Sequence, residues 1–286
     1  MTVIQSFILG IVQGLTEFLP ISSSAHLALV PWLFGWVALQ ASPEVEKSFD
    51  AALHLGTFLA VTVYFRATVW KMCRSFVRTL RNRAAETLED RLVWYVLLAS
   101  VPAALIGFVG EGVISEKLTE PWIMAITLTV FGLAMLMVDR VARLTRDLGS
   151  MRAGDSIIVG LAQTIALIPG TSRSGVTLTA GMLRGFTREE AIRFSFLMSI
   201  PITGGAALYS LYKLYESGAA GTTIGYVELF VGLVTSFLVG YAAVAWLLRY
   251  LRTGTLVPFV VYRIGLSVLI VVLIVTGARP ATIPTG

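Results

Sequence analysis

Charge is scarce in this chain of 286 residues. Only 14% of the residues are Asp, Glu, Lys or Arg, about half the roughly 25% that is typical of soluble domains. Hydrophobic residues make up 56% even before the 26 glycines are counted, and no soluble domain can bury so much apolar surface. The same figures exclude a disordered, collagen-like or coiled-coil chain. We therefore expect an all-α integral membrane protein.

Cysteine, histidine and N-terminal basic residues are also scarce. A single cysteine, Cys73, excludes an internal disulfide. Two histidines are too few for a zinc site with the usual four ligands. The first nineteen residues contain no Lys or Arg, so the positive n-region of a cleavable signal peptide is missing. We expect the N-terminus to belong to the mature protein.

Six apolar stretches are long enough to cross a bilayer, which takes about 20 residues of α-helix. They are approximately residues 49–65, 92–110, 122–138, 194–211, 229–248 and 256–276. Two further apolar regions, 2–35 and 156–185, are interrupted near their centres by proline and small polar residues. Because proline ends a helix and serine caps a new one, each is predicted to be a re-entrant hairpin of two half-helices. Such a break is tolerated at membrane depth only when it is buried in protein or lines a cavity.

The basic residues predict the orientation of these segments. Of the 22 Lys and Arg residues, sixteen lie in segments 66–91, 139–155, 184–193 and 249–255. The alternate connections and the C-terminal tail together carry four. The positive-inside rule places the sixteen in the cytoplasm, and both chain ends are then expected outside. The longest basic segment is expected to contact anionic lipid and not nucleic acid.

The order of segments predicts a single membrane domain, residues 1–286, built as an inverted-topology repeat. Each half, 1–140 and 155–286, has one re-entrant hairpin and three transmembrane helices, and an odd number of crossings inverts the second half. Residues at an offset of 150 support this: GIVQ matches GLAQ, and two serine pairs match, Ser22 and Ser24 with Ser172 and Ser174. Such plans are known chiefly from transporters, which bind substrate where the broken helices meet.

Few polar groups lie within the apolar segments, and most of them lie at the two breaks. A charge at the bilayer centre costs at least about 2.5–3.5 kcal/mol and indicates a functional site. The first break has Gln13 and Glu17 on one helix face, followed by Ser22, Ser23, Ser24 and His26. The second break has Ser172, Arg173, Ser174 and Thr177.

These residue types suit phosphate chemistry. The half-helix N-termini offer free amides and a positive dipole end to an anion, and Arg173 adds a fork that fits phosphate oxygens. Ser23 and His26 have the i, i+3 spacing in which an imidazole can activate a hydroxyl nucleophile. Glu17 can orient His26 or hold a divalent metal against a diphosphate.

Each of these features also has a plainer interpretation. The serines can be helix caps, a Glu17–Arg173 pair can be structural, and the same groups can form the coupling-ion site of a transporter. Elsewhere, Asp50 and His54 are expected to be satisfied by water near the outer end of a span. Arg263, within the last span, is expected either to snorkel inward or to pair with an acid.

Two motifs of the chain resemble those of the undecaprenyl-diphosphate phosphatase family, also called the bacitracin-resistance protein family. Residues 13–26, QGLTEFLPISSSAH, are similar to its first motif, a Glu or Gln four residues before a Glu, then a serine-rich turn and a histidine. Residues 169–177, PGTSRSGVT, are similar to its second motif, PGxSRSxxT. The resemblance covers essentially the whole chain. Gln13 stands where many members have Glu, and Ala25 stands where glycine is common.

The resemblance implies an enzyme that hydrolyses undecaprenyl diphosphate to undecaprenyl phosphate and phosphate. This activity recycles the lipid carrier of bacterial cell-wall peptidoglycan and confers resistance to bacitracin, which competes for the same polyprenyl diphosphate lipid. The catalytic residues would be Glu17, Ser23, His26 and Arg173, with Gln13, Ser22, Ser24, Ser172, Ser174 and Thr177 in contact with substrate. Arg173 would bind the diphosphate, Glu17 with Gln13 would position Mg²⁺ or Ca²⁺ or the acid/base, and either Ser23 or His26 would attack phosphorus. The site would open to the outer face of the cytoplasmic (inner) membrane.

Two other functions are considered. A transporter or flippase would move a lipid phosphate without releasing phosphate, and a combined role is open. A lipid phosphatase of the phosphatidic-acid type is excluded, because its motif SRxxxxxH requires histidine where this chain has Thr179. The sequence leaves the oligomeric state open, a homodimer included.

Overall fold

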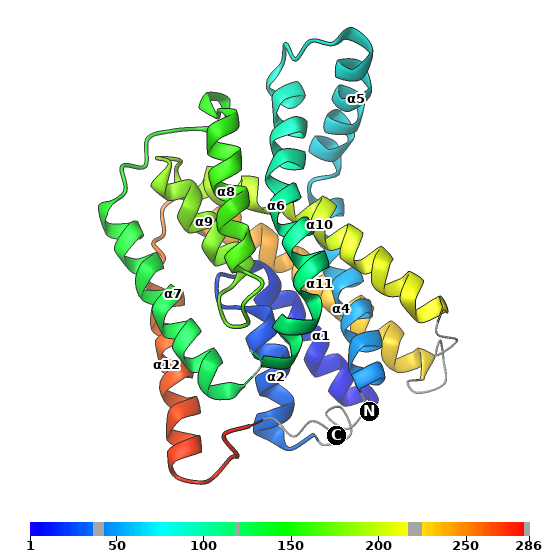
Figure 1. Cartoon of the computed structure of the whole chain (residues 1–286), viewed down its shortest axis with the longest axis vertical. Coiled ribbons are helices and arrows are strands. Elements are labelled where there is room, and N and C mark those ends of the chain that lie inside the picture. Colours follow the sequence, from blue (N-terminus) through cyan, green and yellow to red (C-terminus); the bar gives the residue numbers. More distant parts are fainter. Residues whose placement is uncertain (37–42, 118–119, 217–224, 283–286) are drawn as a thin grey trace.

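The computed structural model describes residues 1–36, 43–117, 120–216 and 225–282, and within these ranges the chain is built from helices (Figure 1). The α-helices are α1 (Val3–Phe18), α2 (Ser23–Phe34), α4 (Pro43–Tyr64), α5 (Arg66–Asn82), α6 (Leu88–Lys117), α7 (Pro121–Val141), α8 (Ala153–Ile165), α9 (Arg173–Leu183), α10 (Arg188–Glu216), α11 (Tyr226–Tyr250) and α12 (Val257–Val275). A 3₁₀ turn, η1 (Leu148–Ser150), precedes α8. The expectation of an all-α chain is confirmed for the described residues.

Five described helices are long and apolar enough to cross a membrane, namely α6, α7, α10, α11 and α12. They coincide with five of the six predicted spans. The remaining prediction, residues 49–65, lies in the second part of α4, residues 49–64. By itself this part is shorter than the roughly 20 residues that a span needs. It qualifies as a span only together with α5, and the two helices bend by 82° at Phe65. The chain is thus a multi-pass membrane protein with five spans in the described ranges, or six if the bent pair is one span.

Both predicted helix breaks are present, and they have the same local structure. The N-cap serine of each second helix has a positive φ, 78° at Ser22 and 75° at Ser172, which non-glycine residues rarely adopt. Each serine Oγ accepts a hydrogen bond from the backbone N–H three residues later, at 3.4 and 3.2 Å, and lies 3.1 Å from the Oγ of the serine two residues later. This equivalence at an offset of 150 supports the repeat. The division into halves 1–140 and 155–286 stays a prediction.

Close packing fixes the position of α1, which lies near the middle of the molecule (Figure 1). A Cβ at Gly14 would lie 2.8 Å from the backbone N of Gly240 in α11, so only small residues allow this contact. At the end of α1 the ring of Phe18 meets that of Phe196 in α10 edge-on, with the centroids 5.4 Å apart. These contacts on two sides place the end of α1, with Glu17, between α11 and α10.

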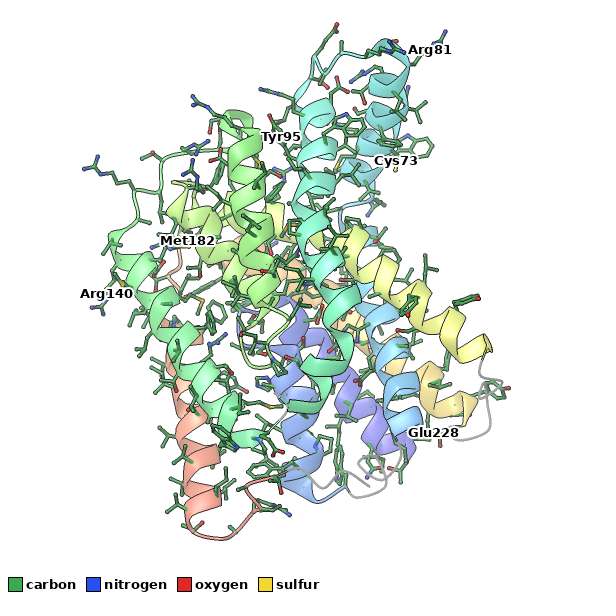
Figure 2. The ribbon with its side chains drawn as sticks, viewed as in Figure 1. Cys73, Arg81, Tyr95, Arg140, Met182 and Glu228 are labelled. Carbon is green, nitrogen blue, oxygen red and sulfur yellow. The ribbon has the colours of Figure 1, made fainter. Side chains whose placement is uncertain are left out.

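The surface agrees with a membrane protein. Large apolar side chains are exposed along the outer helices, among them Met137 of α7 and Val275 of α12, and lipid contact explains such exposure. The basic helix α5 lies at the end of the molecule opposite to the N-terminus (Figure 1). Arg81 lies at this end and Glu228 lies toward the other (Figure 2).

Candidate active site between the two helix breaks

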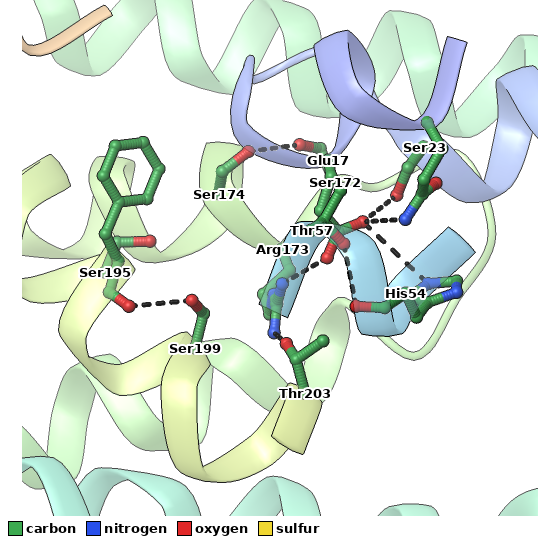
Figure 3. A network of polar contacts seen from close by, with 12 residues as sticks. Glu17, Ser23, His54, Thr57, Ser172, Arg173, Ser174, Ser195, Ser199 and Thr203 are labelled. Carbon is green, nitrogen blue, oxygen red and sulfur yellow. Dashed lines mark hydrogen bonds and ion pairs between the residues drawn. The ribbon is translucent and has the colours of Figure 1, made fainter. Parts of the chain in front are cut away.

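The carboxylate of Glu17 is the centre of the polar contacts that join the two breaks (Figure 3). Glu17 lies in the last turn of α1 and is buried, with 8% of its surface exposed. Its Oε2 accepts hydrogen bonds from Ser23 Oγ at 2.6 Å and from Gln13 Nε2 at 3.3 Å. Its Oε1 accepts a hydrogen bond from Nη2 of Arg173. One carboxylate therefore contacts the first residue of α2 and the first residue of α9.

Arg173 is oriented by a second contact and remains partly open. Its Nη1 donates to Oγ1 of Thr203 in α10 at 2.6 Å. A guanidinium has five N–H donors, so donors remain for a further ligand. The Arg173 side chain is 20% exposed, against 6% for Glu17. An anion that enters this site would therefore meet the guanidinium more readily than the carboxylate.

His26 is held away from the carboxylate. Its Nδ1 donates to the backbone oxygen of Ser22 at 2.7 Å, and its Nε2 lies 2.7 Å from the hydroxyl of Tyr262 in α12. The two rings are stacked, with the centroids 5.6 Å apart. A carbonyl only accepts, so Nδ1 carries a proton, and Nε2 of the neutral ring accepts from Tyr262. The expected contacts of His26 with Ser23 and with Glu17 are not formed, because the carbonyl of its own N-cap and a distant tyrosine engage both nitrogens.

His54 of α4, expected to be satisfied by water, is the histidine that faces Glu17. Its Nδ1 donates to the backbone oxygen of Asp50 at 2.8 Å, and its Nε2 lies 4.0 Å from Oε2 of Glu17. Its side chain is 36% exposed, so it connects the buried carboxylate to the surface. The signal for His54 was available, since Asp50 and His54 are a helical i, i+4 pair in an apolar stretch. Thr203 carried no such signal.

The other predicted binding residues make hydrogen bonds within and between the breaks. Ser174 Oγ donates to the backbone oxygen of Leu19 at 3.1 Å and ties the second break to the first. Thr177 Oγ1 donates to the backbone oxygen of the first residue of α9 at 2.7 Å. Ser24 is exposed. The plainer interpretation of the serines as caps and tethers therefore describes these contacts well.

Oxygen atoms near Glu17 are of the kind that a hard divalent cation binds. In the described part of the chain no three His, Cys, Asp or Glu side chains lie together as a metal site. Oε1 of Gln13, however, is buried without a hydrogen-bond partner, on the same amide whose Nε2 contacts Glu17. Mg²⁺ and Ca²⁺ bind oxygen, and Mg²⁺ is commonly held by one or two carboxylates and substrate phosphates. Gln13 and Glu17 together provide such a partial set.

Comparisons with known proteins find similarity along nearly the whole chain. The family described as bacitracin resistance protein BacA matches residues 6–269. An undecaprenyl-diphosphatase of Pelobacter propionicus is 43% identical over 279 residues, which are 97% of this chain and 99% of that protein. An undecaprenyl-diphosphatase of Moorella thermoacetica is 45% identical over 271 residues, 95% and 97% of the two chains. An undecaprenyl-diphosphatase of Myxococcus xanthus is 43% identical over 278 residues, which are 97% of this chain and 91% of that protein.

Proposed function

The chain belongs to the bacitracin resistance protein family, and we propose that it is a hydrolase that converts undecaprenyl diphosphate to undecaprenyl phosphate and inorganic phosphate. The observation that carries this proposal is the buried Glu17 carboxylate, which is bonded to a serine hydroxyl and to an arginine. The carboxylate, as a base, thereby contacts both a nucleophile and a cation for phosphate oxygens. The product is the lipid carrier of peptidoglycan synthesis, and bacitracin competes for the substrate lipid.

Ser23 is the proposed nucleophile. Its Oγ donates to Oε2 of Glu17 at 2.6 Å, so the carboxylate can accept the hydroxyl proton as Oγ attacks the terminal phosphorus. The bond from this phosphorus to the bridging oxygen breaks, and undecaprenyl phosphate leaves. Water then attacks the phosphoserine, which releases phosphate and restores the hydroxyl. His26 is the weaker candidate because both of its nitrogens are engaged elsewhere.

Arg173 and His54 have supporting roles in this proposal. The free N–H donors of Arg173 bind the nonbridging oxygens of the terminal phosphate, where negative charge gathers in the transition state. His54 Nε2 lies 4.0 Å from Oε2 of Glu17 and the ring is partly exposed, so His54 can carry the proton between the carboxylate and water. The amides at the starts of α2 and α9 add further donors for phosphate.

A divalent cation is part of the proposal. Gln13 Oε1 and the Glu17 carboxylate would hold Mg²⁺ or Ca²⁺ against the diphosphate. The ion would supply positive charge to the phosphate oxygens. The unpartnered Oε1 of Gln13 supports this assignment.

Phosphate release from undecaprenyl diphosphate by the detergent-purified protein tests the function and the cation together. EDTA is expected to abolish release, and Mg²⁺ or Ca²⁺ is expected to restore it. A Gln13→Glu variant adds a carboxylate, so the half-saturating cation concentration should fall by about tenfold. The matched control is Gln163→Glu, the same change at an offset of 150, which should leave that concentration unchanged. Full activity in EDTA would contradict the cation assignment.

Transport of a lipid phosphate is the second candidate, because two equivalent breaks that meet are typical of transporters. Phosphate release distinguishes the two functions. If no lipid or cation condition gives release, movement of labelled lipid phosphate across proteoliposomes should be measured next. The same polar contacts would then be a substrate site of a transporter.

We also propose six transmembrane segments, with residues 49–65 as the sixth and α5 outside the membrane, and two re-entrant hairpins, α1–α2 and α8–α9, in an inverted repeat in the bacterial cytoplasmic membrane. Both chain ends would lie outside, and the site would open to the outer face. The basic segments support this orientation.

Cys73 offers a direct test of this orientation, because it is the single cysteine of the chain and is exposed on α5. A membrane-impermeant maleimide should leave it unlabelled in intact spheroplasts and label it after permeabilisation. The control is Ala278→Cys in a Cys73→Ser background, since exposed Ala278 follows α12 and should be labelled from outside. Labelling of Cys73 in intact spheroplasts would reverse the proposed orientation.

A further inference from the structure

Arg263 of α12 is a buried cation that contacts both helix breaks. It is 1% exposed, and it neither snorkels to the surface nor pairs with a described carboxylate, so neither alternative expected from the sequence is found. All its partners are backbone oxygens: Leu128 (3.0 Å) for Nε, Pro20 (3.2 Å) and Thr171 (3.1 Å) for Nη1, and Gly170 (2.9 Å) and Thr127 (3.4 Å) for Nη2. The five N–H donors of the guanidinium are thereby all used.

Three of these carbonyls belong to the breaks themselves. Pro20 precedes Ser23 in the first break, and Gly170 and Thr171 precede Arg173 in the second. Carbonyls at a helix break lack the intrahelical N–H partner that a continuous helix provides, and buried ones need a substitute. Among the described residues only Arg263 donates to these three. One side chain therefore satisfies carbonyl oxygens of both breaks.

The neighbouring helix α7 packs against this contact. Gly132 lies beside the arginine, and a Cβ there would be in ordinary van der Waals contact, 3.5 Å from Arg263 Nε. Thr127 Oγ1 donates to the backbone oxygen of Pro169 at 2.8 Å. Gly170, with φ 87°, permits this approach, because a Cβ at that position would lie 2.0 Å from Thr127 Oγ1. Side chains of α7 and α12 thus hold the two breaks from one side.

The charge argues for a role beyond packing. A cation buried at membrane depth without an acidic partner is expensive and indicates function. The guanidinium of Arg263 bonds to both breaks, at carbonyls that lie no more than three residues before Ser23 in one and before Arg173 in the other. Catalysis depends on such alignment, and a misplacement of about 1 Å can cost about 100-fold in rate.

We propose that Arg263 is a positioning residue for the hydrolysis, an inference that rests on the proposed function. With Thr127, Arg263 holds the two breaks in the relative position at which Ser23 and Arg173 reach the same carboxylate. It acts through backbone carbonyls and does not contact the substrate. Its geometry, and not its charge alone, is therefore what the reaction needs.

Arg263→Lys separates geometry from charge. Lysine keeps the positive charge but has three donors and no fork, so it cannot reach all five carbonyls. We expect kcat to fall by about 10- to 100-fold, with KM within about threefold of the wild type. Amide hydrogen exchange should become faster at residues 19–25 and 169–175. This second readout is independent of turnover.

The matched control is Ser267→Ala, one turn further along α12. Ser267 joins α12 to α7 through the backbone oxygen of Ala125 at 2.7 Å and through Thr129 at 2.8 Å, and it contacts neither break. It should lower Tm while kcat stays within about twofold. Equal losses of kcat and of amide protection in Ser267→Ala and Arg263→Lys would show that Arg263 has only a packing role. A raised KM with unchanged kcat in Arg263→Lys would show that Arg263 acts as a substrate-binding charge.

Thr127→Val keeps the test decisive if Arg263→Lys does not fold. It removes the hydrogen bond to Pro169 and leaves the arginine in place, so kcat should fall by up to about tenfold, with faster exchange at the second break only. Unchanged exchange and unchanged kcat in Thr127→Val would overturn the proposal. If the wild type releases no phosphate but Arg263→Lys still speeds exchange at both breaks, the proposed function is wrong, whereas the role of Arg263 in holding the breaks is retained.

Discussion

Replacement of Arg173 by alanine is expected to lower the rate of phosphate release by at least about 10³-fold. The guanidinium is the charged group that contacts Glu17 and is itself partly exposed. Its removal also leaves the Glu17 carboxylate buried without its cation, so the terminal phosphate meets an uncompensated negative charge. Initial rates of phosphate release, measured at saturating lipid and cation, check this result.

Two further variants define the role of Arg173. Arg173→Lys keeps the charge but loses the fork, so it should recover only part of the rate. Arg184→Ala removes a positive charge from the other end of α9, where Arg184 pairs with Asp155 at 2.8 Å. This control should keep the rate within about threefold of the wild type. Near wild-type release by Arg173→Ala would eliminate the proposed site.

Ser23→Ala is expected to have the second large effect, a loss of at least about 10³-fold in kcat, because the proposed nucleophile itself is removed. His26→Ala should be milder, about tenfold, because it removes hydrogen bonds within the first break and no reacting atom. The comparison of these two variants identifies the attacking residue. A larger loss in His26→Ala than in Ser23→Ala would reverse the assignment.

A covalent intermediate provides the independent measurement. Protein quenched during turnover should carry one phosphoryl group on the peptide that contains Ser23, detectable by mass spectrometry. Ser199→Ala is the matched control, since Ser199 is a buried serine of α10 that donates to the backbone oxygen of Phe196. It should keep both activity and the phosphorylated peptide. Phosphorylation on His26 instead would exclude Ser23 as the nucleophile.

Local interactions explain which parts of the fold could be predicted. Helix ends depend on residues a few positions apart, so the breaks at Pro20 and Pro169 follow from proline and the serine caps beside it. Long apolar runs predict spans for the same reason. The meeting of Glu17 and Arg173 follows from the cost of an unpaired charge in an apolar interior.

The roles of the two histidines required tertiary information. Whether His26 or His54 faces the carboxylate depends on how α2 and α4 are rotated about their axes. The partner of His26, Tyr262, lies 236 residues away in the sequence, and the partners of Arg263 are backbone oxygens, which leave no pattern of side chains. The bend at Phe65 likewise arises between two helices that each look regular in the sequence.

The two capped breaks have a consequence for the ancestry of the active site. A backbone unit that occurs twice offers every position twice, and Ser23 and Arg173 occupy the same position, directly after a serine cap with positive φ. The residue equivalent to Glu17 is Leu167, so the carboxylate occurs in one copy only. Duplication followed by one divergent side chain in each copy is therefore a short route to the proposed mechanism, in which Ser23 of one copy attacks phosphorus and Arg173 of the other binds phosphate.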